Sequence, residues 1–311
     1  MLKIKLWPFQ LPENCPNIVF ARNEKPPTNH LTDGHTFSPY GTAQQIYNFF
    51  PYNSFPVARL DGTKHTKLLL ADMHKHGVDT RYITTEDGST PVIIQRNIID
   101  KDGNPTHRFE FKDNKGRLYL DFRSLTKKQA ESVIESVEFN PRVFFFDRVS
   151  PAIIDMAEEF KSRRAVVFFE PSCKTTTKGF KKCVELADII KFSDQRIYDV
   201  SCFESKERKL IIQTMGREGL RFRRDSEWIK VLPIDNHSII DTAGAGDWTS
   251  AAFIDLMFSD DTVSLSGVGL RELSEILYQA QAFGSLSCSY EGARRLMQLP
   301  FFDVRNMIAL P

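Results

Sequence analysis

The feature that most constrains the fold is the regular alternation of strand and helix patterns from about residue 126 onward. Helical spacings of apolar residues recur there, and one begins at Ser150-Pro151 with a capping residue and an N-terminal proline. The intervening runs are mostly apolar, as expected of strands buried on both faces, and they lie at residues 143–146, 165–169, 188–192 and 209–213. Strands that alternate with helices imply right-handed crossovers and a mainly parallel sheet. The sequence therefore predicts a doubly wound α/β core that binds ligands beyond the carboxyl ends of its strands.

The stretch from residue 90 to residue 122 has a different pattern. Its β-rich runs lie at residues 91–99, 107–111 and 118–122, and turns rather than helices join them. Such a pattern predicts a small meander set apart from the parallel sheet. A surface excursion without a function is the alternative.

Composition excludes several classes of partner. The 311 residues carry 41 Lys and Arg against 40 Asp and Glu, so no excess of charge draws the whole chain to nucleic acid or to an anionic membrane. The 5 cysteines and 7 histidines lack the spacings of a disulfide framework or a metal site. No apolar run is long enough to span a bilayer, and the N-terminus lacks the apolar segment of a signal peptide. We expect a cytoplasmic α/β domain with a small accessory piece, without nucleic-acid or membrane partners.

One local cluster of charge needs its own interpretation. Arg217, Arg221, Arg223 and Arg224 lie close together after a predicted strand. Nucleic-acid sites combine such basic residues with a series of interleaved stacking aromatics, which this stretch lacks. We therefore interpret it as a solvated hairpin.

The most informative motif is Asp241-Thr-Ala-Gly-Ala-Gly-Asp247, between a predicted strand at residues 228–234 and a mostly apolar predicted helix at residues 248–258. Gly244, Ala245 and Gly246 have so little bulk that a phosphate can approach their backbone N–H groups. The first turn of the helix adds orphan donors and a positive dipole end. An ionised Asp247 repels a phosphate, so phosphate binding does not explain its presence. A role as the base that takes the proton of an attacking hydroxyl does explain it. A plain glycine-rich turn is the alternative.

This motif resembles the DTxGAGD signature of the ribokinase-like (PfkB-type) carbohydrate kinases, which phosphorylate sugars and nucleosides with ATP, and every specified position is present. A match of this length between a strand and a helix favours the resemblance over a plain turn. It implies that Asp247 is the catalytic base and that the backbone of Gly244, Ala245 and Gly246 is the anion hole. It also implies an ATP- and Mg²⁺-dependent kinase that transfers the γ-phosphoryl group to a hydroxyl of a sugar, sugar derivative or nucleoside.

Two further segments resemble the nucleotide site of that family. Residues 214–219 look like the Thr-x-Gly-x-x-Gly that lines the phosphates and ribose of ATP, which implies contacts from Thr214, Gly216 and Gly219. A simple turn after a strand is the alternative there. Residues 279–293 are similar to the helix and turn that flank the adenine, which implies contacts from Ala282 and Gly292.

Asp241 matches a family residue that helps to bind a monovalent cation. The resemblance thus implies K⁺ at Asp241, with the carbonyl of Ala243 as a weaker second ligand. A turn-forming Asp that bonds its own backbone is the alternative, and it stays open.

The acceptor site is expected at Tyr40, Gly41 and Gln45, which stand where the family has its sugar-binding Gly-Gly-x-x-x-Asn. Ribokinase-like proteins cover this site with a small β lid. The resemblance implies a lid from residues 23–39 and 90–122, and a nucleotide-binding core from residues 1–22, 40–89 and 123–311. It leaves open a homodimer through the lid. Because a ring can stack on Tyr40, we expect a modified sugar or a nucleoside rather than plain ribose or fructose as acceptor.

Three departures from the family pattern keep a second class of function open. Residues 193–196 replace the Asn-x-x-Glu that helps to hold Mg²⁺, so that Arg196 stands in place of the acid and Asp194 substitutes for it only if turned inward. Gln45 replaces the sugar-binding Asn, and residues 22–24 lack the usual substrate-binding Asp. A catalytically inactive relative that binds nucleotide or ligand is the alternative. The carboxylate of Asp247 favours the kinase, because it weakens nucleotide binding and has no use in an inactive protein.

Overall fold

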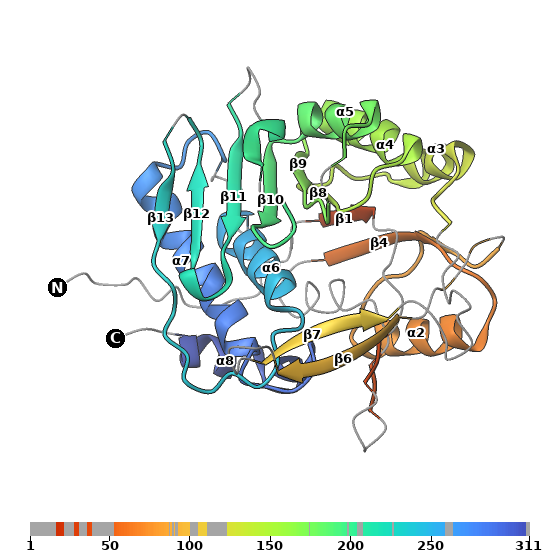
Figure 1. The fold of residues 1–311 in the computed structure, drawn as a ribbon. Coiled ribbons are helices and arrows are strands. Elements are labelled where there is room, and N and C mark those ends of the chain that lie inside the picture. Colours follow the sequence, from red (N-terminus) through yellow and green to blue (C-terminus); the bar gives the residue numbers. More distant parts are fainter. Residues whose placement is uncertain are drawn as a thin grey trace.

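The computed structural model describes residues 17–21, 28–30, 36–38, 53–86, 88, 90, 93–99, 105–110, 123–173, 175–197, 199–203, 208–225, 227–258 and 264–308. These residues form a large sheet between two layers of helices and a second, smaller sheet (Figure 1). Among them, no helix is both long enough and apolar enough to cross a membrane.

The large sheet contains nine of the described strands in the order β13-β12-β11-β10-β9-β8-β1-β4-β5. All neighbours from β5 to β11 pair in parallel, and only β12 and β13 at one edge are antiparallel. The predicted doubly wound, mainly parallel sheet is therefore confirmed. Its strands are β1 (Asn17–Ala21), β4 (Asn53–Arg59), β5 (Ile83–Thr84), β8 (Val143–Phe146), β9 (Val166–Phe169), β10 (Ile189–Ser193), β11 (Leu210–Thr214), β12 (Leu220–Arg223) and β13 (Ile229–Val231).

Helices cover both faces of this sheet, because its central strands are apolar on both sides. Phe144 and Phe146 of β8 pack with α3, α4 and α5, whereas Phe145 packs with α6 and α7 on the opposite face. All three rings are fully buried, as the continuous apolar run predicts. The helices are α2 (Lys64–Lys75), α3 (Lys127–Ser136), α4 (Pro151–Ser162), α5 (Lys178–Leu186), α6 (Ala245–Phe258), α7 (Leu270–Ser287) and α8 (Phe301–Ile308).

Local signals place several helix ends. The Ser150 hydroxyl accepts a hydrogen bond from the Ile153 N–H at 3.3 Å, and Pro151 is the first residue of α4, as predicted. Thr126 and Gln129 form a capping box at the start of α3. Helix α6 starts three residues before the predicted range and so takes Asp247 into its first turn.

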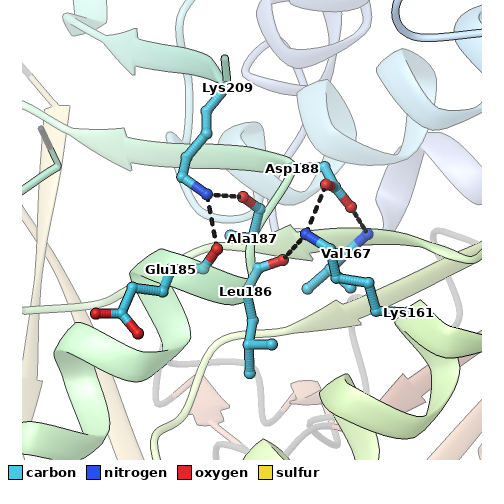
Figure 2. A network of polar contacts seen from close by, with 7 residues as sticks. All are labelled: Lys161, Val167, Glu185, Leu186, Ala187, Asp188 and Lys209. Carbon is cyan, nitrogen blue, oxygen red and sulfur yellow. Dashed lines mark hydrogen bonds and ion pairs between the residues drawn. The ribbon is translucent and has the colours of Figure 1, made fainter. Parts of the chain in front are cut away.

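Two lysines satisfy the carbonyls at the end of α5 (Figure 2). Lys209 donates to the carbonyl oxygens of Glu185 and Ala187 at 2.8 and 2.7 Å. Lys161 donates to that of Leu186 and to the Asp188 carboxylate, at 2.7 and 2.9 Å. The last carbonyls of a helix lack partners within it and carry its negative dipole end, so both ammonium groups stabilise this end. The network lies at the amino ends of β10 and β11, away from the edge where ligands are expected.

The arginine-rich stretch is not simply solvated. Arg221 and Arg223 of β12 both stack on Trp228, with 4.4 and 5.1 Å between guanidinium carbon and ring centroid. Arg224 is buried and donates to the Val268 carbonyl at 2.5 Å. The predicted hairpin is present, because β12 pairs antiparallel with β11, and Arg217 is exposed. The expected solvation of the other arginines is corrected, because Arg224 is buried and Trp228 folds back onto Arg221 and Arg223.

The smaller sheet joins two distant parts of the chain. It has the order β3-β2-β6-β7 and contains β2 (Thr28–His30), β3 (Thr36–Ser38), β6 (Ile93–Ile99) and β7 (Pro105–Glu110). Figure 1 shows β6 and β7 apart from the large sheet. The predicted strand at residues 118–122 lies outside the described residues. That this sheet is a lid, and the domain boundaries drawn from it, stay predictions.

Candidate functional site

The predicted anion hole lies at the start of α6. Gly244 has a positive φ of 80°, and a Cβ there would approach the Ala293 Cβ to 2.6 Å, so only glycine fits. Ala245 is the first residue of α6, Gly246 is exposed, and Asp247 is half-buried. The structure therefore brings these four residues together at one helix N-terminus, with the backbone of Gly246 open to solvent.

This helix start meets the carboxyl ends of the central strands. The Lys191 ammonium of β10 donates to the Gly246 carbonyl at 3.1 Å and to Glu170 Oε1 at 2.7 Å. Glu170 directly follows β9, and its other oxygen accepts a hydrogen bond from the Ser250 hydroxyl of α6 at 2.7 Å. The turn thus occupies the edge of the sheet where ligands of such folds bind.

Sequence reasoning missed Lys191, Glu170 and Ser250. One signal is present in the sequence, because Lys191 is a charged residue between the apolar Ile190 and Phe192. Another was Glu170, at the end of the preceding strand. Neither indicates by itself that the two side chains pair beneath a turn more than fifty residues away.

Asp241 ties the motif to the segment that follows α7. Its Oδ1 accepts from the Ala243 N–H at 2.9 Å, and its Oδ2 accepts from the Gly292 N–H at 3.0 Å. The first bond is the turn-forming role that the sequence leaves open for Asp241. The second connects it to Gly292, a residue predicted to lie near the adenine. Asp241 is 4% exposed, so this carboxylate lies inside the junction of the two turns.

The turn after α7 contacts the start of α6 and helps to hold it in place. The Ala293 carbonyl accepts a hydrogen bond from Trp248 Nε1 at 2.8 Å, and Gly292 adopts a positive φ of 77°. Arg294 forms an ion pair with Asp72 of α2. Burial raises the pKa of the nearby Cys288 thiol to about 11, and the charge of Asp241 adds to this effect. Cys288 is therefore protonated at neutral pH.

The other predicted nucleotide contacts differ in exposure. Thr214 ends β11 half-buried, and Gly216 is exposed with a positive φ of 55° and open space where a Cβ would stand. Gly219 is buried, and a Cβ there would lie 2.6 Å from the Val231 carbonyl. Ala282 of α7 is 4% exposed. Thr214 and Gly216 are thus accessible to a ligand, whereas packing and a positive φ of 87° explain why position 219 is glycine.

The segment in place of Asn-x-x-Glu turns one carboxylate oxygen inward. Asp194 follows β10, and its backbone N–H donates to the Thr214 carbonyl at 3.0 Å. Its Oδ1 is buried and has no hydrogen-bond partner within the described part of the chain. Arg196 is exposed. Carboxylate oxygens are the ligands that Mg²⁺ or its water shell prefers, so Asp194 fits such an ion where Arg196 does not.

The acceptor side is only partly described. Tyr40, Gly41 and Gln45 lie outside the described residues, as do residues 22–24. The sequence order of the strands reverses between β1 and β8, and such a switch point opens a crevice at the carboxyl ends. Asp147 and Arg148 follow β8 there, and their carboxylate and guanidinium groups are 3.8 Å apart. Neither was among the predicted site residues.

Comparisons with known proteins agree with this architecture. The family model described as pfkB family carbohydrate kinase matches residues 59–299. A comparison with curated proteins gives no match. Similar solved structures include an Arabidopsis thaliana ribokinase complexed with ribose and ATP, which is 17% identical, with 96% of this chain and 100% of that one covered and a TM-score of 0.65.

Two others are similar to the same degree. The Salmonella enterica aminoimidazole riboside kinase complexed with aminoimidazole riboside and an ATP analogue is 13% identical over 94% of this chain and 100% of that one, with a TM-score of 0.66. A double mutant of Vibrio cholerae fructokinase with bound fructose, ADP and potassium is 14% identical over 94% and 99%, with a TM-score of 0.67. At such identities these structures show the likeness of the fold. Since the family model covers most of the chain, the protein belongs to the pfkB family of carbohydrate kinases.

Proposed function

We propose that the protein is an ATP-dependent kinase that transfers the γ-phosphoryl group to a hydroxyl of a sugar, sugar derivative or nucleoside. Membership of the family supports a carbohydrate kinase. The observation that carries the proposal is the half-buried carboxylate of Asp247 in the first turn of α6, beside the open backbone of Gly246. A base and the N–H groups of a helix start thus lie on consecutive residues, which supports in-line transfer to an alcohol.

The proposed reaction needs one proton acceptor and one anion hole. The acceptor oxygen attacks the γ phosphorus, its proton moves to Asp247, and the bond from phosphorus to the leaving oxygen of ADP breaks. Negative charge on the transferred group meets the backbone N–H groups at positions 244–246 and the positive end of the α6 dipole. Thr214, Gly216, Gly219, Ala282 and Gly292 are the proposed contacts of the nucleotide.

Two cations complete the proposal. Mg²⁺ neutralises phosphate charge when bound, and we place Asp194 beside it because its buried Oδ1 has no partner in the described region. For K⁺ the candidate is Asp241, with the Ala243 carbonyl as a second ligand. Each oxygen of Asp241 accepts one backbone hydrogen bond and so keeps a lone pair for a cation. Potassium in the similar fructokinase structure supports this choice.

The acceptor is proposed to dock at Tyr40, Gly41 and Gln45, beneath a lid from residues 23–39 and 90–122. The similar structures bind ribose, fructose or aminoimidazole riboside, which supports a sugar-like acceptor class. The ring of Tyr40 favours a modified sugar or a nucleoside over plain ribose or fructose. A cytoplasmic location and a homodimer through the lid also stay predictions.

One observation favours a second candidate, a catalytically inactive protein that binds nucleotide or ligand. Arg196 stands where the family pattern has an acid, and it is exposed. A screen of sugars, sugar derivatives and nucleosides with ATP·Mg²⁺ separates the two candidates, with ADP formation and thermal shift measured in parallel. We expect acceptor-dependent ADP formation with at least one modified sugar or nucleoside. ATP-induced stabilisation without turnover on any acceptor would instead support the inactive protein.

A further inference from the structure

Lys191 is a buried charge in the middle of the sheet. It is 2% exposed within β10, and its neighbours Ile190 and Phe192 belong to the apolar core. Burial of an ammonium group is costly unless it is paired, and a buried ion pair often stabilises a fold less than apolar residues of the same size. Its presence is therefore better explained by what the ammonium holds in place than by stability.

The ammonium holds the peptide that links the anion hole to the base. Its bond to the Gly246 carbonyl, at 3.1 Å, lies on the peptide unit whose N–H belongs to Asp247. A positive charge on that carbonyl polarises the peptide and strengthens the N–H as a donor. A Cβ on Gly246 would lie 3.7 Å from the Lys191 ammonium and 4.0 Å from Glu170 Oε1, so the ion pair lies directly against this residue.

Glu170 extends the contact to a second point on the same helix. Its two oxygens bind the Lys191 ammonium and the Ser250 hydroxyl, both at 2.7 Å. Gly246 and Ser250 are four residues apart, so they lie on the same face of α6. Contacts at both positions fix the rotation of α6 about its axis. That rotation determines where the carboxylate of Asp247 points.

We propose that Lys191 is a positioning residue, held by Glu170, that orients the Gly246–Asp247 peptide and thereby both the anion hole and the base. The catalytic part of this inference rests on the proposed kinase function, whereas the structural part does not. In this proposal the Lys191–Glu170 pair connects the ends of β9 and β10 to α6, beneath the reacting groups. Lys191 itself is not expected to touch a substrate.

The chain contains a matched control for Lys191. Lys209 is also nearly fully buried, at 4% exposure, and its ammonium also binds backbone carbonyls, at 2.7 and 2.8 Å. It does so at the opposite end of the strands, against α5 (Figure 2). Loss of either ammonium removes two hydrogen bonds made by a buried side chain, so Lys191→Met and Lys209→Met should both lower Tm. Only Lys191→Met should change the start of α6.

Two measurements test the inference. The first is hydrogen exchange of residues 242–250, which should speed up in Lys191→Met and stay at the parent rate in Lys209→Met. It needs no activity, so it decides the structural part even if the kinase proposal fails. The second is steady-state kinetics on the best acceptor. Removal of a direct oxyanion donor costs about 10²–10³ in kcat, so we expect a smaller fall of ~10- to 100-fold from the indirect Lys191, with both KM values changed less than about threefold.

A milder variant, Ser250→Ala, keeps the inference testable if Lys191→Met does not fold. Ser250→Ala removes one hydroxyl, keeps both charges, and should lower kcat less than Lys191→Met does while it still speeds exchange at the start of α6. Unchanged exchange in both Lys191→Met and Ser250→Ala would overturn the inference. Equal losses of kcat in Lys191→Met and Lys209→Met would also overturn it, because that result would show a general effect of lost stability. A parent protein without any turnover would count against the kinase proposal alone.

Discussion

At the residue scale, the site depends on contacts between residues that are distant in sequence. Asp241 illustrates what the sequence can predict and what it cannot. Its bond to the Ala243 N–H follows from the local tendency of Asp to close a turn. Its bond to the Gly292 N–H joins positions 51 residues apart, and no local pattern indicates it. Lys191 is a similar case, because the sequence shows a charged residue in an apolar run but does not indicate which residue it pairs with.

Asp61 provides a prediction at this scale. Its Oδ1 accepts from the Thr63 hydroxyl and N–H at 2.6 and 3.0 Å and from the Thr66 hydroxyl at 2.7 Å, and its Oδ2 accepts from the Thr90 N–H at 3.0 Å. Burial alone would raise the pKa of Asp61, but these hydrogen bonds outweigh burial and hold the pKa well below its usual range. A lowered pKa in the folded state stabilises the protein above the unfolded pKa of about 3.9, and this contribution is lost as the pH falls toward the folded value.

Asp61→Asn should therefore lower the free energy of unfolding by about 1–2 kcal/mol at pH 7. Urea unfolding of parent and variant at several pH values checks this, and the difference should shrink below about pH 4. Asp235→Asn is the control, since that side chain is 82% exposed and should change stability little. A difference that stays constant down to the acid limit would show that the charge of Asp61 is not what matters.

At the element scale, the apolar runs predict the strands well because both faces of the sheet are covered. Strands β8, β9, β10 and β11 lie within a residue of their predicted ranges. Strand β13 contains only Ile229–Val231 of the predicted 228–234, because it is an edge strand with one neighbour. The early start of α6 follows from Gly244, whose positive φ ends the preceding loop. Capping signals predict helix starts better than apolar periodicity does in a helix that is mostly buried, such as α6.

The two glycines at the start of α6 should separate stability from catalysis. Gly244→Ala places a methyl group against Ala293 at a positive φ, so it should destabilise the protein by about 1–3 kcal/mol. Gly246 has no positive φ and its Cβ position meets only ordinary contacts, so Gly246→Ala should leave Tm unchanged or higher.

We nevertheless expect Gly246→Ala to lower kcat by ~10-fold or more, because the methyl group lies against the Lys191 ammonium and disturbs the contact that positions the proposed anion hole. Thermal unfolding and steady-state kinetics on both variants check the pair. A Gly246→Ala enzyme with the kcat of the parent would remove this backbone from the anion hole.

At the scale of the whole molecule, the fold brings parts of the chain together that no local pattern connects. The smaller sheet joins β2 and β3 to β6 and β7 across more than fifty residues. The ion pair between Arg294 and Asp72 joins the turn after α7 to α2. The sequence predicts the doubly wound core through its alternation, whereas such pairings depend on tertiary packing. The central strands and the helix start at Asp247 then meet at one edge of the sheet.

The central claim is that Asp247 is the base of a phosphoryl transfer. Its most direct test compares the parent with Asp247→Asn on the best acceptor, with ATP affinity and Tm measured alongside and Asp235→Asn as control. Loss of a general base costs ~10²–10⁴-fold in rate, whereas loss of a negative charge near phosphates should not weaken nucleotide binding. We predict that turnover falls by that factor while ATP affinity and Tm stay within error of the parent. Turnover of Asp247→Asn within about threefold of the parent would contradict the account.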